Sequence, residues 1–184
     1  MTESRQPAQH SGYPVALVRT VSLPDGRAVT IRPIRPGDAA VERDFVKGLS
    51  AQSRYQRFMY TLRDLSPEML SRLTQIDYDR EMALIAVQDT PQGERQVGVA
   101  RYVMLPDGQS CEFAIVVADD WQGKGLAYQL MQHLIEVARD HGLRVMDGFR
   151  LLKNARMQDL ARSLGFQSGI DPDDPNLVRM RLVL

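Results

Sequence analysis

The stretch that decides the fold runs from Val116 to Ala138 and reads VVADDWQGKGLAYQLMQHLIEVA. An apolar run stops at Asp119 and Asp120, a loop with two glycines follows, and apolar residues return from Leu126 at helical spacing. We interpret this as a strand, a turn and a helix. The first N–H groups of a helix have no partner within it, and together with the helix dipole they attract anions. The turn therefore predicts a cradle for a phosphate or pyrophosphate.

Length and composition restrict the class of protein. The 184 residues fit one domain, which we place at residues 15–184 after a disordered tail at residues 1–14. Lys plus Arg and Asp plus Glu both number 23, so no excess of positive charge indicates nucleic acid or a membrane surface as a partner. A single cysteine, Cys111, excludes an intrachain disulfide, and no group of cysteines and histidines has metal-ligand spacing. These two observations predict a reducing compartment and no metal. Because no stretch resembles a membrane span or signal peptide either, we expect a cytoplasmic protein.

The segments before the cradle predict a hairpin, three helices and a meander of three strands. We expect the hairpin at 15–22 and 28–33, and the strands of the meander at 82–87, 96–104 and 111–118, with a turn at 91–94. Asp38 is a possible cap for the first helix, and Ser66 with Pro67 indicates the start of the third. The apolar sides of the three helices are Val41, Phe45 and Leu49; Tyr55, Phe58, Met59 and Leu62; and Met69, Leu70, Leu73 and Ile76.

After the cradle the apolar stripe of its helix ends at Gly142. A strand at 144–149, a helix at 154–164 and a last strand at 177–184 complete the expected elements. The sum is an α+β fold, a mixed and mostly antiparallel sheet with helices on both faces.

The cradle also carries a family resemblance. Gln122, Gly125 and Ala127, placed after a strand, resemble the acetyl-CoA-binding signature of the GNAT superfamily of N-acetyltransferases. The order of elements from residue 28 to 184 is similar to the whole GNAT fold, and Leu164–Gly165–Phe166 looks like a turn common in that family. The resemblance implies that acetyl-CoA is the cosubstrate. It implies that the residues in contact with it are Ile115, Val116, Val117, Gln122, Gly123, Lys124, Gly125, Leu126, Ala127 and Asn154.

In the family, backbone groups of the cradle hold the pyrophosphate and the strand before it supplies main-chain groups. A backbone N–H near Val117 would polarise the thioester carbonyl, which is stabilisation of the oxyanion type. Asn154 matches an asparagine that contacts CoA, and it is equally suited to cap its own helix. Without the resemblance, a glycine-containing helix start and a solvated Lys124 remain an ordinary alternative. The residues fit a P-loop poorly, because no Ser or Thr follows Lys124 and the four-residue spacer of a P-loop is missing.

A second likeness lies outside the cradle. The segments 31–60 and 76–87 look like those of bacterial Pat-type protein lysine acetyltransferases. This resemblance implies a lysine side chain of a protein as the acceptor, with an acyl-CoA synthetase as the candidate substrate. In that group the domain is often fused to a synthetase-like or cyclic-nucleotide-binding domain, and neither is found in this sequence.

Acetyl transfer to lysine requires a base, because only about one lysine in a thousand is neutral near pH 7 when the pKa is about 10.4. A carboxylate near the thioester can take the proton directly or through a water molecule. Pat-like enzymes carry this carboxylate on the strand that matches 111–118, where the charged residue is Glu112. A solvated glutamate at the start of a strand is the alternative interpretation, and Glu81 and Asp79 are the next candidate bases.

Other chemistry-bearing residues receive weaker predictions. Many GNAT enzymes have a tyrosine general acid after the asparagine, but no tyrosine follows Tyr128 here, so we assign no general acid. Cys111 could suggest an acetyl-cysteine intermediate, although alternation directs it away from the face of Glu112. Trp121 is expected to pack, with adenine stacking as an alternative. An aromatic and arginine cluster is expected to be partly core and partly acceptor wall: Arg54, Tyr55, Arg57, Phe58 and Tyr60.

Two alternatives to a protein acetyltransferase stay open. The first is an enzyme that acetylates a small amine, an amino acid or an antibiotic. The second is a non-catalytic sensor that binds acyl-CoA in the same cradle and regulates a partner.

Overall fold

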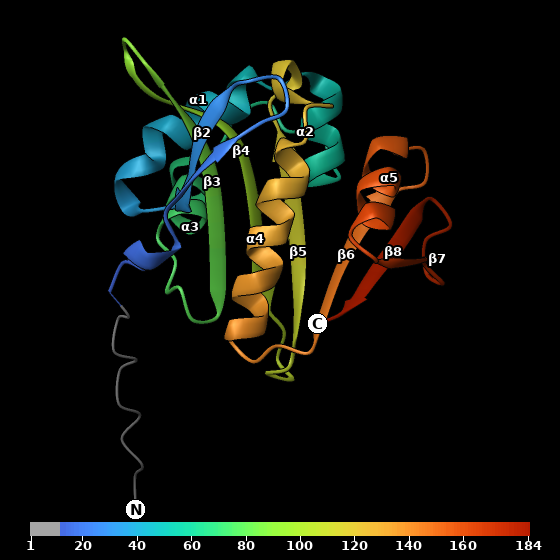
Figure 1. Cartoon of the computed structure of the whole chain (residues 1–184). Coiled ribbons are helices and arrows are strands. Elements are labelled where there is room, and N and C mark those ends of the chain that lie inside the picture. Colours follow the sequence, from blue (N-terminus) through green and yellow to red (C-terminus); the bar gives the residue numbers. More distant parts are fainter. Residues whose placement is uncertain (1–11) are drawn as a thin grey trace, which may run out of the picture.

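The computed structural model describes residues 12–184 (Figure 1). The expected disordered tail lies mostly outside these residues. Tyr13, near its end, donates a hydrogen bond to the carbonyl of Pro33 at 2.9 Å. Its ring also meets that of Tyr78 edge-on, with 6.0 Å between the centroids. Tyr13 is therefore attached to the folded domain.

Within the described part of the chain, eight strands form one sheet in the order β1-β2-β3-β4-β5-β6-β8-β7. β5 and β6 run parallel, and all other neighbours are antiparallel. The predicted mixed, mostly antiparallel sheet is thus confirmed. The strands are β1 (Arg19–Ser22), β2 (Ala28–Pro33), β3 (Glu81–Thr90), β4 (Gly93–Met104), β5 (Ser110–Val117), β6 (Val145–Leu151), β7 (Gln167–Ile170) and β8 (Leu177–Val183).

Helices cover both faces of this sheet (Figure 1). On one face, leucines of α4 pack over Gly98 of β4, and Phe166, which follows α5, stacks near Phe113 of β5. On the other face, Arg101 of β4 donates to the carbonyl of Leu73 in α3 at 2.8 Å. The helices are α1 (Ala39–Gly48), α2 (Ala51–Phe58), α3 (Pro67–Thr74), α4 (Leu126–Asp140) and α5 (Ala155–Ser163), with short 3₁₀ turns at Val15–Leu17, Pro36–Asp38 and Asp119–Trp121.

β5 and β6 separate part of the way along their length. Their parallel register covers only Ser110 to Phe113 against Val145 to Gly148. Beyond Phe113 the two strands have no ladder between them, although β5 stays paired with β4 and β6 with β8. Gly148 lies where the ladder ends, and its lack of a side chain is required, because a Cβ there would lie 2.3 Å from the Phe113 ring.

Several predicted boundaries are confirmed and others are wrong. Ser66 accepts a hydrogen bond from the N–H of Met69 and Pro67 begins α3, as predicted. Asp38 does not cap α1; its carboxylate instead binds the buried Arg32 through two bonds of 2.8 Å. A buried arginine without a carboxylate partner costs more free energy than a helix without a side-chain cap.

The remaining corrections concern short or frayed segments. Val15–Leu17 is a 3₁₀ turn, so the first strand begins only at Arg19. α2 ends at Phe58 because Met59 adopts a left-handed conformation with φ 62°, and α3 ends before Ile76. β3 and β4 extend to leave a shorter turn than 91–94. β7 was not predicted, since its four residues are all exposed and show no apolar alternation.

Candidate active site

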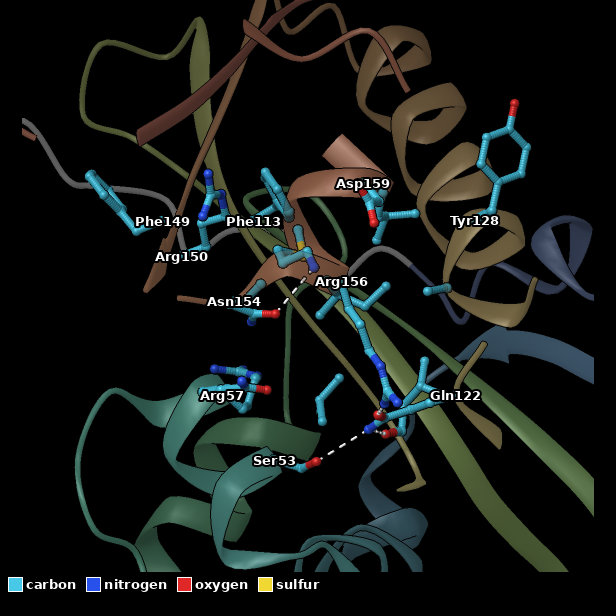
Figure 2. Close-up of a pocket in the computed structure, with 18 of the residues that line it drawn as sticks. Ser53, Arg57, Phe113, Gln122, Tyr128, Phe149, Arg150, Asn154, Arg156 and Asp159 are labelled. Atoms are coloured by element: carbon cyan, nitrogen blue, oxygen red, sulfur yellow. Dashed lines mark hydrogen bonds between the residues drawn. The ribbon is translucent and has the colours of Figure 1, made fainter. Parts of the chain in front are cut away.

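A cavity of about 660 Å³ opens where β5 and β6 separate. α2 forms one wall, and the starts of α4 and α5 lie near the other (Figure 2). Most of the predicted site residues line it, namely Glu112, Ile115, Val116, Val117, Gln122, Gly123, Gly125, Ala127 and Asn154. Lys124 and Leu126 are not among the lining residues. The Leu126 side chain is buried in the core with 1% exposure, so this residue belongs to the cradle only through its backbone.

The floor of the cavity includes a strand edge without a neighbouring strand. Ile115, Val116 and Val117 line the cavity beyond the last pair of the β5–β6 ladder. The Gln122 amide donates to the carbonyl of Val117 at 3.0 Å and thus caps one group of this edge. Main-chain groups of β5 therefore border the space in which an extended ligand could lie.

The cradle has the backbone form that its glycines allow. Gly123 has φ 71° and Gly125 has φ 87°, and Gly125 is the N-cap of α4 without a side-chain hydrogen bond. A residue with a Cβ would be strained at these angles. The first N–H groups of α4 are therefore free of capping side chains, which suits the binding of an anion.

A hydrogen-bond network ties the cradle to α2 and α5. Asp119 accepts from the N–H and hydroxyl of Ser50 and from the hydroxyl of Ser53, at 2.8–2.9 Å. Burial raises the pKa of Asp119, but these bonds outweigh it and hold the pKa below its usual value. Gln122 donates to the Ser53 hydroxyl at 3.2 Å and accepts from Arg156 of α5 (Figure 2). The network fixes three sides of the cavity relative to one another.

Glu112 differs from the other carboxylates nearby. It is exposed, lines the cavity, and has no hydrogen bond or ion pair with the described residues. Asp147, its register partner on β6, is buried and binds Arg179 and Arg181 at 2.6–2.9 Å. The hydrogen bond from Arg181 lowers the pKa of Asp147, so this carboxylate stays ionised and its charge is balanced by the arginines. Asp159 also lines the cavity, but it forms an ion pair with Arg162 at 3.8 Å. Glu112 is therefore the cavity-lining carboxylate that has no partner among the described residues and could accept a proton from a ligand.

The other candidate nucleophile and bases are placed less favourably. Glu81 and Asp79 do not line the cavity. Cys111 is completely buried, and burial raises the pKa of its thiol to about 12. Tyr128 lines the cavity, but its hydroxyl points away from the other labelled residues in Figure 2 and receives a bond from Gln132. The geometry therefore identifies no general acid among these residues.

Asn154 combines the two roles considered for it. Its side-chain oxygen accepts from the N–H of Met157 at 3.2 Å and so caps α5. The same residue lines the cavity between Arg150 and Arg156 in the view of Figure 2. The cap holds the start of α5 at the cavity wall.

The members of the aromatic and arginine cluster point in different directions, so only some of them line the cavity. Arg57 and Phe58 line the cavity, whereas Tyr55 and Tyr60 are exposed outside it. Trp121 is buried, and the guanidinium of Arg27 lies 3.9 Å from its ring centre, so it packs as expected.

Several lining residues were missed by the sequence interpretation. No local motif contains them, because they reach the cavity from three different elements: Ser53 from α2, Phe149 and Arg150 from β6, and Arg156 from α5. Arg150 directly follows the predicted strand 144–149, at a position where a buried arginine is unusual. In the structure its side chain is 5% exposed and donates to the carbonyls of Leu151 and Leu152.

Residues 12–184 contain neither a membrane-spanning helix nor a cluster of metal ligands. None of the helices there combines the length and the apolar character that a membrane crossing requires. No three side chains of the types His, Cys, Asp and Glu gather as ligands for a metal ion in the same residues.

Comparison with known proteins was made for both sequence and structure. The sequence model of the acetyltransferase (GNAT) family matches residues 49–166. Acetyltransferase PA5475 of Pseudomonas aeruginosa is 43% identical over 163 residues, which are 89% of this chain and 88% of that protein. The L-methionine sulfoximine/L-methionine sulfone acetyltransferase of the same species is 48% identical, but only over 56 residues, which are 30% of this chain and 33% of that protein.

Among solved structures, the GNAT domain of PAT from S. lividans superposes with a TM-score of 0.84 at 28% identity. The match covers 94% of this chain and 99% of that domain. The similarity therefore extends over nearly the whole domain, and not only the cradle.

Proposed function

Because the chain belongs to the GNAT family of acetyltransferases, we propose that it transfers the acetyl group of acetyl-CoA to the side-chain amine of a lysine in a protein. The observation that carries this proposal is the position of Glu112. This unpaired carboxylate lies on the strand that borders the cavity, next to the point where β5 and β6 separate. An acyl-CoA synthetase is the proposed substrate, and the cytoplasm, where acetyl-CoA meets such enzymes, is the proposed compartment.

Binding of the cosubstrate is assigned to backbone more than to side chains. The N–H groups at the start of α4 and the glycines Gly123 and Gly125 are suited to the pyrophosphate. The unpaired edge at Ile115–Val117 is suited to the extended pantetheine arm, which has amide groups of its own. Asn154 borders the same space from the start of α5.

In the proposed reaction the lysine nitrogen attacks the thioester carbonyl directly. Its proton passes to Glu112, directly or through one water molecule, and the carbon–sulfur bond breaks as CoA leaves as a thiolate. A backbone N–H near Val117 stabilises the oxyanion that forms on the carbonyl oxygen. The thiolate takes its proton from water, since no side chain is assigned as general acid.

The likeness of residues 31–60 and 76–87 to Pat-type enzymes supports lysine as the acceptor, as does similarity to the S. lividans PAT domain. A small amine is the second candidate acceptor. The short similarity to an acetyltransferase of L-methionine sulfoximine and sulfone favours it. Acyl-CoA sensing without transfer is the third.

The test incubates the protein with labelled acetyl-CoA and either a cell lysate or a panel of small amines. Glu112→Gln should lower kcat at pH 7 by about 10²- to 10⁴-fold while CoA binding persists. The defect should shrink above pH 9, because more of the amine is then neutral without a base. Glu81→Gln is the matched control, as Glu81 lies outside the cavity.

An equally active Glu112→Gln variant would refute the assignment of the base. Labelling of small amines but not of lysates would select the second candidate. Tight CoA binding with no transfer to either would select the sensor.

A further inference from the structure

Arg57 lies in the wall of the cavity without a partner for its charge. It belongs to α2, is partly buried, and makes no hydrogen bond or ion pair with the described residues. Its guanidinium is 4.9 Å from the ring centre of Phe58, the next residue. In contrast, Arg32 and Arg181 each bind a buried carboxylate at 2.8 Å. Arg57 is therefore a cation presented to whatever occupies the cavity.

The protein behind Arg57 holds one further cation and one carboxylate, and neither forms a hydrogen bond or ion pair with Arg57 in the described residues. Arg101 is a second guanidinium close by, and Glu42 is a completely enclosed carboxylate that receives a bond from Gln96 at 2.6 Å. Burial, and then the charge of Arg101, lower the pKa of Arg57 to about 10 against the opposing effects of Glu42 and Tyr60, so Arg57 remains protonated near neutral pH. Burial raises the pKa of Glu42, which further weakens the available negative charge. A desolvated cation in such surroundings gains strongly from an incoming anion.

The position of Arg57 separates it from the phosphate cradle. Ser53, one helical turn earlier in α2, already reaches Gln122 of the cradle. One turn advances the helix by about 5.4 Å, so Arg57 lies further along the cavity. Figure 2 agrees, with Arg57 on the opposite side of Ser53 from the labelled residue Gln122. The CoA phosphates are already provided for at the start of α4, whereas Arg57 faces the remaining space.

Arg57 and Glu112 also share one face of the sheet. Arg101, which acts on Arg57, pairs in register with Ala114 of β5, and Glu112 is two residues from Ala114. Side chains two residues apart on a strand point to the same side. A molecule whose amine meets Glu112 therefore has a cation within the same cavity on the same side.

From this arrangement we propose that Arg57 binds a carboxylate of the acceptor, close to the amine that is acetylated. The planar guanidinium can accept such a group through two parallel hydrogen bonds. The carboxylate has two sources, the α-carboxylate of a free amino acid or an acidic side chain beside the target lysine. The inference rests on the proposed acetyl transfer and specifies the acceptor for it.

The experiment compares acceptors that differ only in the carboxylate. One pair is a blocked lysine peptide with Glu or Gln beside the lysine, and the other is L-methionine sulfone or its carboxamide. One of the two pairs contains the carboxylate that Arg57 binds in the natural acceptor. For that pair, wild-type kcat/KM should be about 10- to 100-fold higher for the carboxylate form, as expected for a charge-assisted hydrogen bond. Arg57→Gln should reduce this ratio to near one, and Arg57→Lys should keep part of it.

Arg54→Gln is the matched control, because it removes the same charge from the same helix. Arg54 donates to the carbonyl of Lys47 and does not line the cavity, so the ratio should stay at its wild-type value. Thermal unfolding of each variant shows whether it is folded.

Three results would overturn the inference: equal rates for both members of each pair, a preference that survives Arg57→Gln, or a large loss of CoA affinity in that variant. The last would assign Arg57 to the cosubstrate. If the wild type acetylates neither pair and no protein, acetyl transfer itself fails, which is distinct from transfer without a carboxylate preference.

Discussion

At the scale of single residues, buried groups without partners define how the protein responds to pH. His133 of α4 has 3% exposure, and neither ring nitrogen has a hydrogen-bond partner within the described residues. Burial lowers the pKa of His133 to about 4, the charge of Arg19 acts in the same direction, and Glu136 opposes both. The folded protein therefore keeps this imidazole neutral under conditions in which the unfolded chain protonates it.

We predict a loss of stability on acidification that originates from His133. The unfolded chain binds the proton below about pH 6.5, whereas the folded state does so only near pH 4, so the free energy of unfolding falls as pH falls through this window. Between pH 7 and 5 the loss from this residue is on the order of 2 kcal/mol. Urea unfolding of wild type and His133→Leu measures it. The variant should lack this component, and parallel pH curves for the two proteins would contradict the prediction.

The scale of secondary-structure elements is where the cavity originates. The β5–β6 ladder ends at the pair of Phe113 and Gly148, and the Phe113 ring lies over the glycine. Phe166 packs against that ring, with 5.1 Å between the centroids. An aromatic ring and a missing side chain thus define the end of the ladder.

We predict that Gly148→Ala destabilises the protein and narrows the cavity. The new Cβ would lie 2.3 Å from the Phe113 ring, which Phe166 prevents from moving freely. Overpacking of this kind costs about 1–3 kcal/mol, and CoA affinity should fall because Phe113 lines the cavity. Denaturant unfolding and CoA titration measure both effects.

Gly169→Ala in β7 provides the control for this prediction. It is also a strand glycine, but a Cβ there would have no atom within 4 Å. Its stability should change by no more than about 0.5 kcal/mol. If both variants were equally stable, the steric account of the ladder end would be wrong.

The sequence predicts features that depend on neighbouring residues better than features that depend on contacts between distant segments. The strand, turn and helix around Gly125 and the start of α3 at Ser66 rest on neighbouring residues, and both were predicted. Glu112 was selected by resemblance and as the charged residue of its predicted strand, and it lines the cavity in the structure. Arg57 and Arg150 converge from separate elements, so no local pattern indicated that both line one space. β7 is recognisable only through its pairing with β8.

At the scale of the whole molecule, the sheet consists of two parts joined by a short ladder. The first part consists of β1 to β5 with α1 to α4, and the second consists of β6, β8 and β7 with α5 (Figure 1). Only four register pairs join β5 to β6. A ligand in the gap would contact both parts and supplement this junction.

We predict that CoA stabilises the molecule across this junction. At 100 times the Kd it should add about 2.7 kcal/mol, equivalent to a Tm increase of about 5–10 °C for a chain of this size. Amide hydrogen exchange should slow in residues 122–130 and also in 145–151. Inorganic pyrophosphate, which can occupy only the cradle, should slow exchange in the first range alone. Protection by CoA that is confined to the first range would contradict a bridging position.

The two strand edges that face this gap have a further consequence for how the protein behaves in solution. An unpaired edge is a template on which another chain can add a strand, and such additions lead to aggregation. Here Gln122 occupies the carbonyl of Val117, and Arg150 occupies those of Leu151 and Leu152. The walls from α2 and the start of α5 flank the same opening. The domain can thus keep a split sheet open for a slender ligand while it leaves fewer free carbonyls for a foreign β-strand to pair with.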